Sequence, residues 1–245
     1  MGSWRTRKSS GNEDRAAYIQ QIEMKLSLLL FAVVAAYGAE SLQAVQARMD
    51  KSAAEFVSLK SRVKKISYTA IIKDTATETG EFIVKKLKSG DVRVRMEVEK
   101  PDARSIALSR KKYEVFLPKI NTVQEYDLSQ YGKLIDQFLL LGFGTPVAEL
   151  QKSYTMRVNG AEMIDGKMAT KVEMVPKADS IKAHLKLIEV WIPPGDGNPV
   201  QQKFTQPSGD YVMTTYYDVK INPLLKDADV QLTLPKHVKR EKPQK

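Results

Sequence analysis

The spacing of apolar residues changes along the chain from a helical to a strand-like pattern. From Leu42 to Ala53 the apolar residues recur every three or four positions, and Ser41 can cap the first turn, which predicts an amphipathic helix. Farther on, the segment DVRVRMEVEK alternates without exception. Such alternation predicts an antiparallel strand with one buried and one solvated face. The apolar face carries Val92, Val94, Met96 and Val98, and the charged face carries Arg93, Arg95, Glu97 and Glu99.

Short strand-like segments occupy most of the chain. The first is the alternation of Ile66, Tyr68, Ala70 and Ile72. The others are GEFIVKKLK, RSIALSR, YEVFLP, TVQEYD, YTMRVNG, KMATKVEMVP, HLKLIEVWIP, VQQKFTQ, YVMTTYYDVKI and DVQLTLP. Clusters of Gly, Pro, Asn and Asp separate these segments and suit tight turns. Because no long helices alternate with the strands, we expect one antiparallel meander that curls and closes fully or partly on itself.

One segment, DLSQYGKLIDQFLLLGFGTPVAELQKSY, interrupts the strands. Its apolar residues would cover most of the circumference of a helix, which predicts a helix buried from more than one side. Gly142 and Gly144 would end this helix, and Thr145 and Pro146 would start a second short one as N-cap and first residue. Two interpretations remain open and are compatible: a core helix that closes one end of a barrel, and a lid that an apolar ligand displaces.

The N-terminal region contains an apolar run typical of an export signal. The segment MKLSLLLFAVVAAYGAE begins at Met24 with a short basic start and ends in small residues. The run is shorter than the roughly 20 residues that span a bilayer, but it has the length and flanks of a cleavable signal. We therefore expect a leader over residues 1–39, with Met24 as the true start and cleavage after Ala36 or Ala39. A buried N-terminal helix is the alternative.

Composition limits the possible functions. Of the 245 residues none is cysteine, and the formal net charge is +10. We expect one exported, soluble domain over residues 40–238 and a basic disordered tail over residues 239–245, because no cysteine is present to carry a lipid anchor. Basic residues alternate with acidic ones and are not interleaved with aromatic ones, which disfavours nucleic-acid binding. Attraction to an anionic membrane surface fits this charge better.

Residues for catalysis or metal binding are sparse. The two histidines, His184 and His237, lie far apart, and the zinc, phosphate-loop and nucleophile-elbow motifs are missing from the sequence. Asp227 and Asp229 suit a polar turn better than a calcium site. We therefore expect neither a cofactor nor a metal, and an enzyme is disfavoured.

The strand segments resemble, in their order, those of the bacterial outer-membrane lipoprotein carrier (LolA) family. The resemblance rests on GEFIVKK, RVRMEVEKP, YEVFLPKINTV, VEMVPK, IEVWIP, YDVKIN and LTLPKHV, and it covers the chain from Leu42 to about Val238. It implies a strongly curved, incomplete antiparallel barrel whose apolar concave face is covered by short helices. It also implies a periplasmic monomer that takes acylated lipoproteins from an inner-membrane release complex and delivers them to an outer-membrane receptor.

From this resemblance and the apolar pattern we predict the site. The acyl-chain cavity is expected to be lined by Val92, Val94, Met96, Val98, Ile106, Leu108, Met174 and Trp191. The lid is expected to consist of Leu134, Ile135, Phe138, Leu139, Leu141 and Phe143. The family's lid-clamping arginine is replaced here, because Lys85-Lys86-Leu87 stands where Lys-Arg-Pro is common. Lys86 and Arg95 are therefore the clamp candidates, although a lysine lacks the planar donor fork of arginine.

Two other functions stay open. A domain of this family could act as a lipid-binding sensor or regulator of the cell envelope, which would need a partner-facing surface. An envelope enzyme would need a cluster of polar residues inside the curled sheet.

Overall fold

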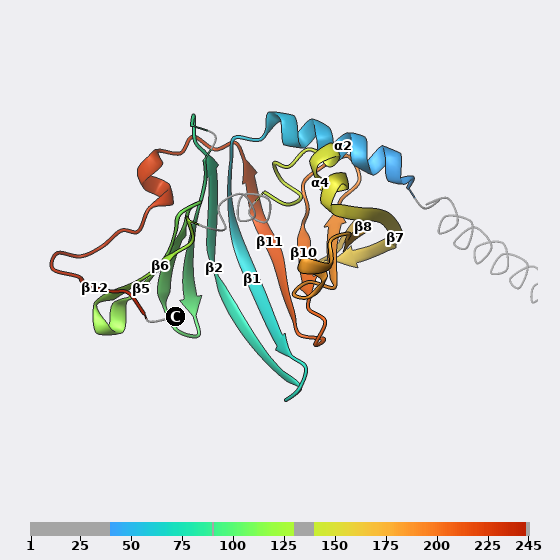
Figure 1. Ribbon diagram of the computed structural model, residues 1–245. Coiled ribbons are helices and arrows are strands. Elements are labelled where there is room, and N and C mark those ends of the chain that lie inside the picture. The colour runs from blue at the N-terminus through green and yellow to red at the C-terminus, as the bar shows by residue number, and fades with distance from the viewer. Residues whose placement is uncertain (1–39, 90, 130–139, 244–245) are drawn as a thin grey trace, which may run out of the picture. The chain divides into compact units, whose positions relative to one another are not determined.

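The computed structural model describes residues 40–89, 91–129 and 140–243 (Figure 1). By their contacts, residues fall into two units, Met1–Glu40 and Ser41–Lys245, and every described helix and strand belongs to the second. The predicted leader lies outside the described residues.

Strands dominate the described part of the chain, where twelve of them form one sheet in the order β12-β6-β5-β4-β3-β2-β1-β11-β10-β9-β8-β7. All neighbours run antiparallel except β12 and β6, which are parallel. The strands are β1 (Ser58–Thr69), β2 (Asp74–Lys86), β3 (Val92–Lys100), β4 (Arg104–Leu108), β5 (Lys112–Leu117), β6 (Thr122–Asp127), β7 (Tyr154–Ile164), β8 (Lys167–Pro176), β9 (Leu187–Ile192), β10 (Gln201–Thr205), β11 (Tyr211–Ile221) and β12 (Lys239–Glu241).

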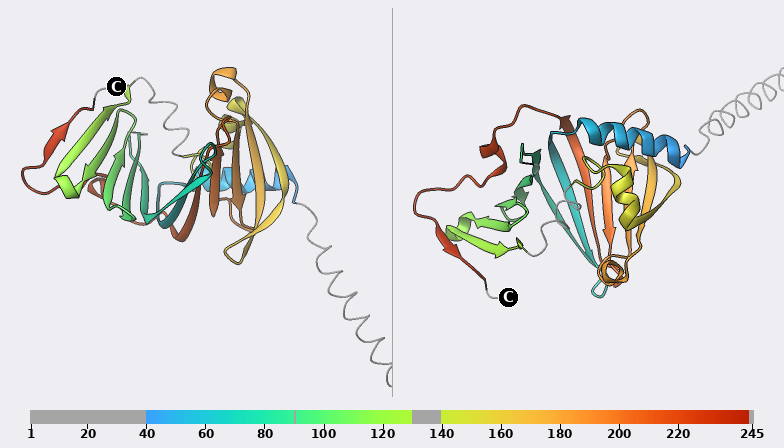
Figure 2. Two further views of the ribbon diagram at one scale, coloured as in Figure 1. Left: turned by 90° about the horizontal axis from the view of Figure 1, so that it is seen from below. Right: turned by 45° about the horizontal axis from the view of Figure 1, so that its top comes forward.

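The sheet curls without closing. Its two edge strands are β7 and β12, at opposite ends of the strand order. Figure 2 shows the curl, with α4 on the face toward which the sheet bends, called the concave face below. The predicted fold, a curved and incomplete antiparallel barrel with short helices on one face, is confirmed.

Short helices complete the described chain. They are α2 (Leu42–Glu55), η1 (Pro118–Ile120), α4 (Val147–Ser153), α5 (Asp179–Lys182) and η3 (Asp227–Val230). The predicted first helix is confirmed as α2, and its predicted cap is present, because the Ala44 backbone N–H donates to Ser41 Oγ at 3.2 Å. None of the helices in the described ranges has the length and apolar character needed to cross a bilayer.

The start of α4 differs from the prediction by one residue. Pro146 stands at the N-cap position, and the Thr145 hydroxyl has no hydrogen-bond partner among the residues that the structure describes. The first free N–H of the helix, that of Val147, instead donates to Asp50 Oδ1 of α2 at 2.7 Å. The cap therefore comes from a helix about a hundred residues away in sequence.

The first predicted strand ends earlier than its alternation indicated. β1 ends at Thr69, and Lys73 closes the turn into β2 with a positive φ of 52°. Ile72, expected to continue the alternation, lies in this turn and is 67% exposed, and its neighbour Ile71 is 90% exposed. Asp210 Oδ1 accepts a hydrogen bond from the Ala70 N–H at 2.7 Å and so fixes the start of the turn.

The predicted basic tail is partly ordered. Residues Lys239–Glu241 form β12 and extend the sheet beyond β6. Arg240 of this strand donates to the carboxylates of Glu114 and Glu125. These ion pairs hold the last strand, and no short-range pattern in the sequence indicated them.

The buried apolar residues form two clusters. The first lies under α2 and α4 and joins them to β7, β8 and β9; it includes Val45, Met49, Leu141, Val147, Leu150, Val172, Met174, Ile188 and Val190. The second joins the end of α2 to β1, β2 and β3; it consists of Phe56, Leu59, Val63, Val84, Val92, Val94, Leu140, Phe143 and Tyr216.

Candidate functional site

Strand register builds a continuous apolar strip on the concave face. One row aligns Leu59, Val84, Val94 and Leu108 across β1 to β4. The next row aligns Ser61, Phe82, Met96 and Ile106. Since side chains two positions apart share a face, both rows point to the same side of the sheet. The strip crosses four strands without a charged residue.

The turn after residue 139 packs onto this strip. Leu140 and Phe143 belong to the second cluster with Val84 and Val94, whereas Leu141 belongs to the first. The N–H groups of Phe143 and Gly144 both donate to the Leu140 carbonyl, at 2.9 and 3.0 Å. The turn therefore joins the two clusters with apolar side chains on both of its sides.

Close packing leaves little space around this turn. A Cβ added to Gly144 would lie 2.8 Å from a ring carbon of Phe56. Gly142 has a φ of +81°, in the left-handed region that glycine adopts without strain. The two glycines predicted to end a helix are thus required where the backbone approaches Phe56 and turns.

A buried polar pair anchors the turn to the sheet. Gln202 Nε2 donates to the Leu141 carbonyl, and the Tyr216 hydroxyl donates to Gln202 Oε1 at 2.8 Å. Burial raises the pKa of Tyr216, so its hydroxyl stays protonated and remains a donor. The Phe143 ring meets the Tyr216 ring edge to face, with centroids 5.1 Å apart.

The residues predicted to line the cavity differ in how deeply they are buried. Val92, Val94 and Val98 are buried, with 1%, 4% and 3% of their surface exposed. Met96, Ile106 and Leu108 are only half-buried. The strand-derived residues of the predicted cavity therefore share one face, with the valines packed into it and the larger side chains at its partly open surface.

The other two predicted lining residues lie elsewhere. Met174 is fully buried in the first cluster, beneath α2 and α4. Trp191 alternates with Val190 and Ile192 of that cluster and so lies on the opposite face of β9. Its indole Nε1 donates to Glu162 Oε2 at 2.8 Å, and Lys171 Nζ lies 5.8 Å from the ring centroid. Because Trp191 takes part in this polar network, we do not include it in the concave strip.

Most of the predicted lid, Leu134, Ile135, Phe138 and Leu139, lies outside the described residues. Its remaining members, Leu141 and Phe143, are buried against the sheet, with 1% and 2% exposure. That an apolar ligand displaces this segment stays a prediction.

The two clamp candidates take different positions. Arg95 alternates with Val94 and Met96, so it lies on the convex face, where its Nε is 3.2 Å from Glu97 Oε1. Lys86 is exposed at the end of β2, opposite Val92. Of the two, Lys86 shares the face of Val84, so a clamp on the lid remains a prediction for Lys86.

The concave strip ends in a charged cluster on its far side. Glu78 Oε2 accepts a hydrogen bond from Lys65 Nζ at 3.0 Å, and Arg104 donates to the other carboxylate oxygen. Burial alone would raise the pKa of Glu78, but the hydrogen bonds from Arg104 and Lys65 outweigh it and hold the pKa below its ordinary value. These charges bound the apolar strip.

Groups that suggested other chemistry are engaged in structural contacts. Asp227 pairs with Lys85 Nζ at 2.5 Å, and Asp229 Oδ2 accepts from the Lys226 N–H at 2.6 Å to cap η3. In the part of the chain that the structure describes, no three His, Cys, Asp or Glu residues are grouped to hold a metal ion.

Sequence reasoning missed several residues of the site. Phe82 packs on the second cluster from β2, and its alternation with Val84 in EFIV was a usable signal. Phe56, Gln202 and Tyr216 reach the site through long-range contacts, and nothing local in the sequence marks them.

Several solved structures are similar to this chain. The complex of MucA and MucB from Pseudomonas aeruginosa matches with 14% identity over 78% of this chain and 59% of that one, at a TM-score of 0.43. Lipoprotein LppX from Mycobacterium tuberculosis matches with 16% identity over 76% and 100%, at a TM-score of 0.47. A LolA superfamily protein from Nitrosomonas europaea matches with 15% identity over 79% and 99%, at a TM-score of 0.37.

These likenesses concern the fold alone. This chain spans less than two thirds of the MucB chains that it matches, 62% and 59% in two structures. No family model matches the sequence, and no curated protein is similar to it.

Proposed function

We propose that this protein binds the acyl chains of lipoproteins on its concave strip and carries them through the periplasm from the inner to the outer membrane. The observation that supports the proposal most is the uncharged apolar strip across β1 to β4, on which the turn at Leu140–Gly144 packs. The order of strand motifs, which resembles that of the lipoprotein carrier family, supports the same function.

The energetics fit a carrier. Burying a methylene group yields about 0.8 kcal/mol, so one long acyl chain gains on the order of 10 kcal/mol before any cost. A cargo that must displace Leu140 and Phe143 loses the contacts of those side chains with Val84 and Val94. The net affinity is then a difference between two apolar contacts, which lets the protein both take up and release its cargo without a nucleotide.

A binding measurement with a matched variant tests the proposal. We expect a synthetic triacylated lipopeptide to bind the full chain saturably and the same peptide without acyl chains not to bind. Met96→Glu places a carboxylate on the half-buried surface of the strip and should weaken binding at least about tenfold, since 1.4 kcal/mol corresponds to a factor of ten.

The control carries the same new charge on the opposite face. Lys64 is exposed on β1 and alternates with Val63 of the second cluster, so Lys64→Glu should leave the affinity unchanged. Equal binding by Met96→Glu and the unsubstituted chain, both folded by circular dichroism, would reject the strip as the acyl site.

A further inference from the structure

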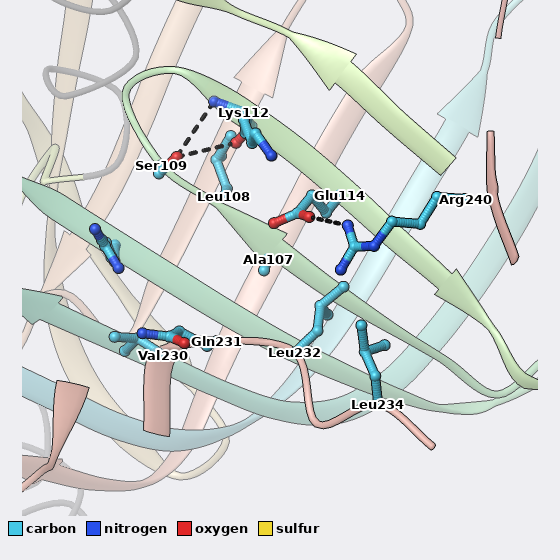
Figure 3. Close-up of a pocket in the computed structure, with 11 residues that line it drawn as sticks. Ala107, Leu108, Ser109, Lys112, Glu114, Val230, Gln231, Leu232, Leu234 and Arg240 are labelled. Atoms are coloured by element: carbon cyan, nitrogen blue, oxygen red, sulfur yellow. Dashed lines mark hydrogen bonds and ion pairs between the residues drawn. The ribbon is translucent and has the colours of Figure 1, made fainter. Parts of the chain in front are cut away.

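A pocket lies mainly on the convex face of the sheet, and Leu108, the last residue of one row of the concave strip, is among the residues that line it. Its volume is about 310 Å³, within the range of small-molecule sites, which start at roughly 300 Å³. Figure 3 shows the pocket between β4, β5 and the segment Val230–Leu234, with Arg240 of β12 at one end. Ala107 lies on the strand side, and Leu232 and Leu234 rise toward it from the C-terminal segment.

The C-terminal segment is fixed on both sides of this pocket. Before the pocket, Lys85 Nζ donates to the Leu225 carbonyl at 2.8 Å, and Val230 is buried with 2% exposure. Beyond it, the Lys239 N–H donates to the Asn121 carbonyl at 3.0 Å where β12 joins the sheet. The pocket is therefore held open between two attachment points of one segment.

Most charges around the pocket are already paired. Arg240 lies between the carboxylates of Glu114 and Glu125, and the dashed contact to Glu114 is visible in Figure 3. Asp227 is 2.5 Å from Lys85 Nζ. The acidic groups near the pocket are thus engaged by Arg240 and Lys85.

Arg93 is the exception. It lies directly across from Lys85 in the β2–β3 register, and like charges in cross-strand positions destabilise a sheet unless both are neutralised. Among the described residues Arg93 makes no hydrogen bond or ion pair, and its Nε is buried without a partner. The hydrogen bond from Lys85 lowers the pKa of Asp227 most, and the positive charge of Arg93 lowers it further. The Arg93 side chain lines the pocket.

A second cation faces the same space. Lys112 lines the pocket, is 55% exposed and has only a loose contact, 3.8 Å, with Glu125. Arg93 and Lys112 therefore bring positive charge to a cavity whose C-terminal wall carries two leucines. We propose that this pocket binds a small anionic amphiphile, with a phosphate or carboxylate on Arg93 and Lys112 and a short alkyl chain against Leu232 and Leu234.

Octyl phosphate is the probe for this site. Isothermal titration of the full chain should give saturable binding, because guanidinium groups bind phosphate through paired hydrogen bonds. Arg93→Gln should weaken binding at least tenfold, and Lys112→Gln should weaken it less. Lys64→Gln, at an exposed lysine elsewhere on the sheet, should leave the affinity unchanged.

Three further measurements distinguish this pocket from nonspecific binding and from the concave strip. Inorganic phosphate should bind much more weakly than octyl phosphate, and octyltrimethylammonium should not bind. Met96→Glu should leave octyl phosphate binding intact, whatever happens to the lipopeptide. The proposal would be overturned if both Arg93→Gln and Lys112→Gln bound octyl phosphate with unchanged affinity. It would also be overturned if octyltrimethylammonium or inorganic phosphate bound as tightly as octyl phosphate. Loss of binding in Met96→Glu would overturn it as well, because the probe would then bind on the concave strip.

Discussion

At the scale of single residues, the polar pair behind the apolar turn decides how firmly that turn is held. The Tyr216 hydroxyl and the Gln202 amide form a short chain of hydrogen bonds that ends on the Leu141 carbonyl. The pair is buried among Phe143, Leu140 and the strip. Because an unmade hydrogen bond in such a site is costly, this pair fixes the turn in one position.

Tyr216→Phe removes the hydroxyl and leaves Gln202 Oε1 without its donor. We expect a loss of about 1–3 kcal/mol in the free energy of unfolding, measured by urea denaturation. Tyr126→Phe is the matched control, because the Tyr126 hydroxyl donates at 3.3 Å to Gln124 at an exposed position. Its loss should stay within about 0.5 kcal/mol. Equal losses in the two variants would contradict a special role for the buried pair.

Residue patterns predicted which face of the sheet a side chain occupies better than they predicted which distant residues it contacts. Strict alternation in β3 correctly separated Val92, Val94, Met96 and Val98 from the arginines between them, because the period of two is a property of the strand itself. The same logic did not reveal that Trp191 points away from the first cluster, since β9 carries large apolar side chains on both faces, with Glu189 beside Trp191. Nor did it reveal Gln202 and Tyr216, whose role depends on contacts with distant strands.

At the scale of elements, the charged cluster at the far end of the strip ties three strands together. Lys65 of β1, Glu78 of β2 and Arg104 of β4 meet at one carboxylate. Glu78 has 16% of its side chain exposed, so the cluster is mostly shielded from water. Its side-chain contacts join β4 to β2 across β3, in addition to the backbone hydrogen bonds between neighbouring strands.

Glu78→Gln should lower the free energy of unfolding by about 2 kcal/mol at pH 7, because hydrogen bonds to a charged group are lost. The folded-state pKa of Glu78 lies below its ordinary value. Its contribution is therefore complete above the unfolded pKa of about 4.3 and is lost as the pH falls through the folded value. The difference between the two proteins, followed by urea denaturation from pH 7 to pH 3, should shrink toward low pH.

A control on α4 isolates this effect. Glu149→Gln removes an exposed carboxylate that pairs with Lys152 within one helix turn, and its effect should be below about 0.5 kcal/mol. A pH-independent difference for Glu78→Gln would show that the carboxylate charge does not stabilise the cluster.

Elements with a strong local signal were predicted well, and those set by distant contacts were not. The α2 helix follows from its periodicity and its Ser41 cap. The start of α4 depends on Asp50, and β12 depends on Glu114 and Glu125, so neither could be derived from neighbouring residues. The β1–β2 turn was misplaced because Ala70 and Ile72 continue the alternation of β1, although Ile72 lies exposed in the turn.

At the scale of the whole molecule, one curled sheet presents two different faces. The concave face carries the apolar strip under the Leu140–Gly144 turn. The convex face carries ion pairs and the pocket beneath the C-terminal segment. The curvature was predictable from a long antiparallel meander and the family resemblance, whereas the strand order at the β12 edge was not.

Photo-crosslinking to a triacylated lipopeptide tests the central claim most directly. A photoreactive phenylalanine analogue is placed at Met96 on the strip or at Arg62, which is exposed on the convex face of β1. The proposed function predicts strong labelling from position 96 and none from position 62. Labelling from position 62 without labelling from position 96 would contradict acyl-chain binding on the concave face.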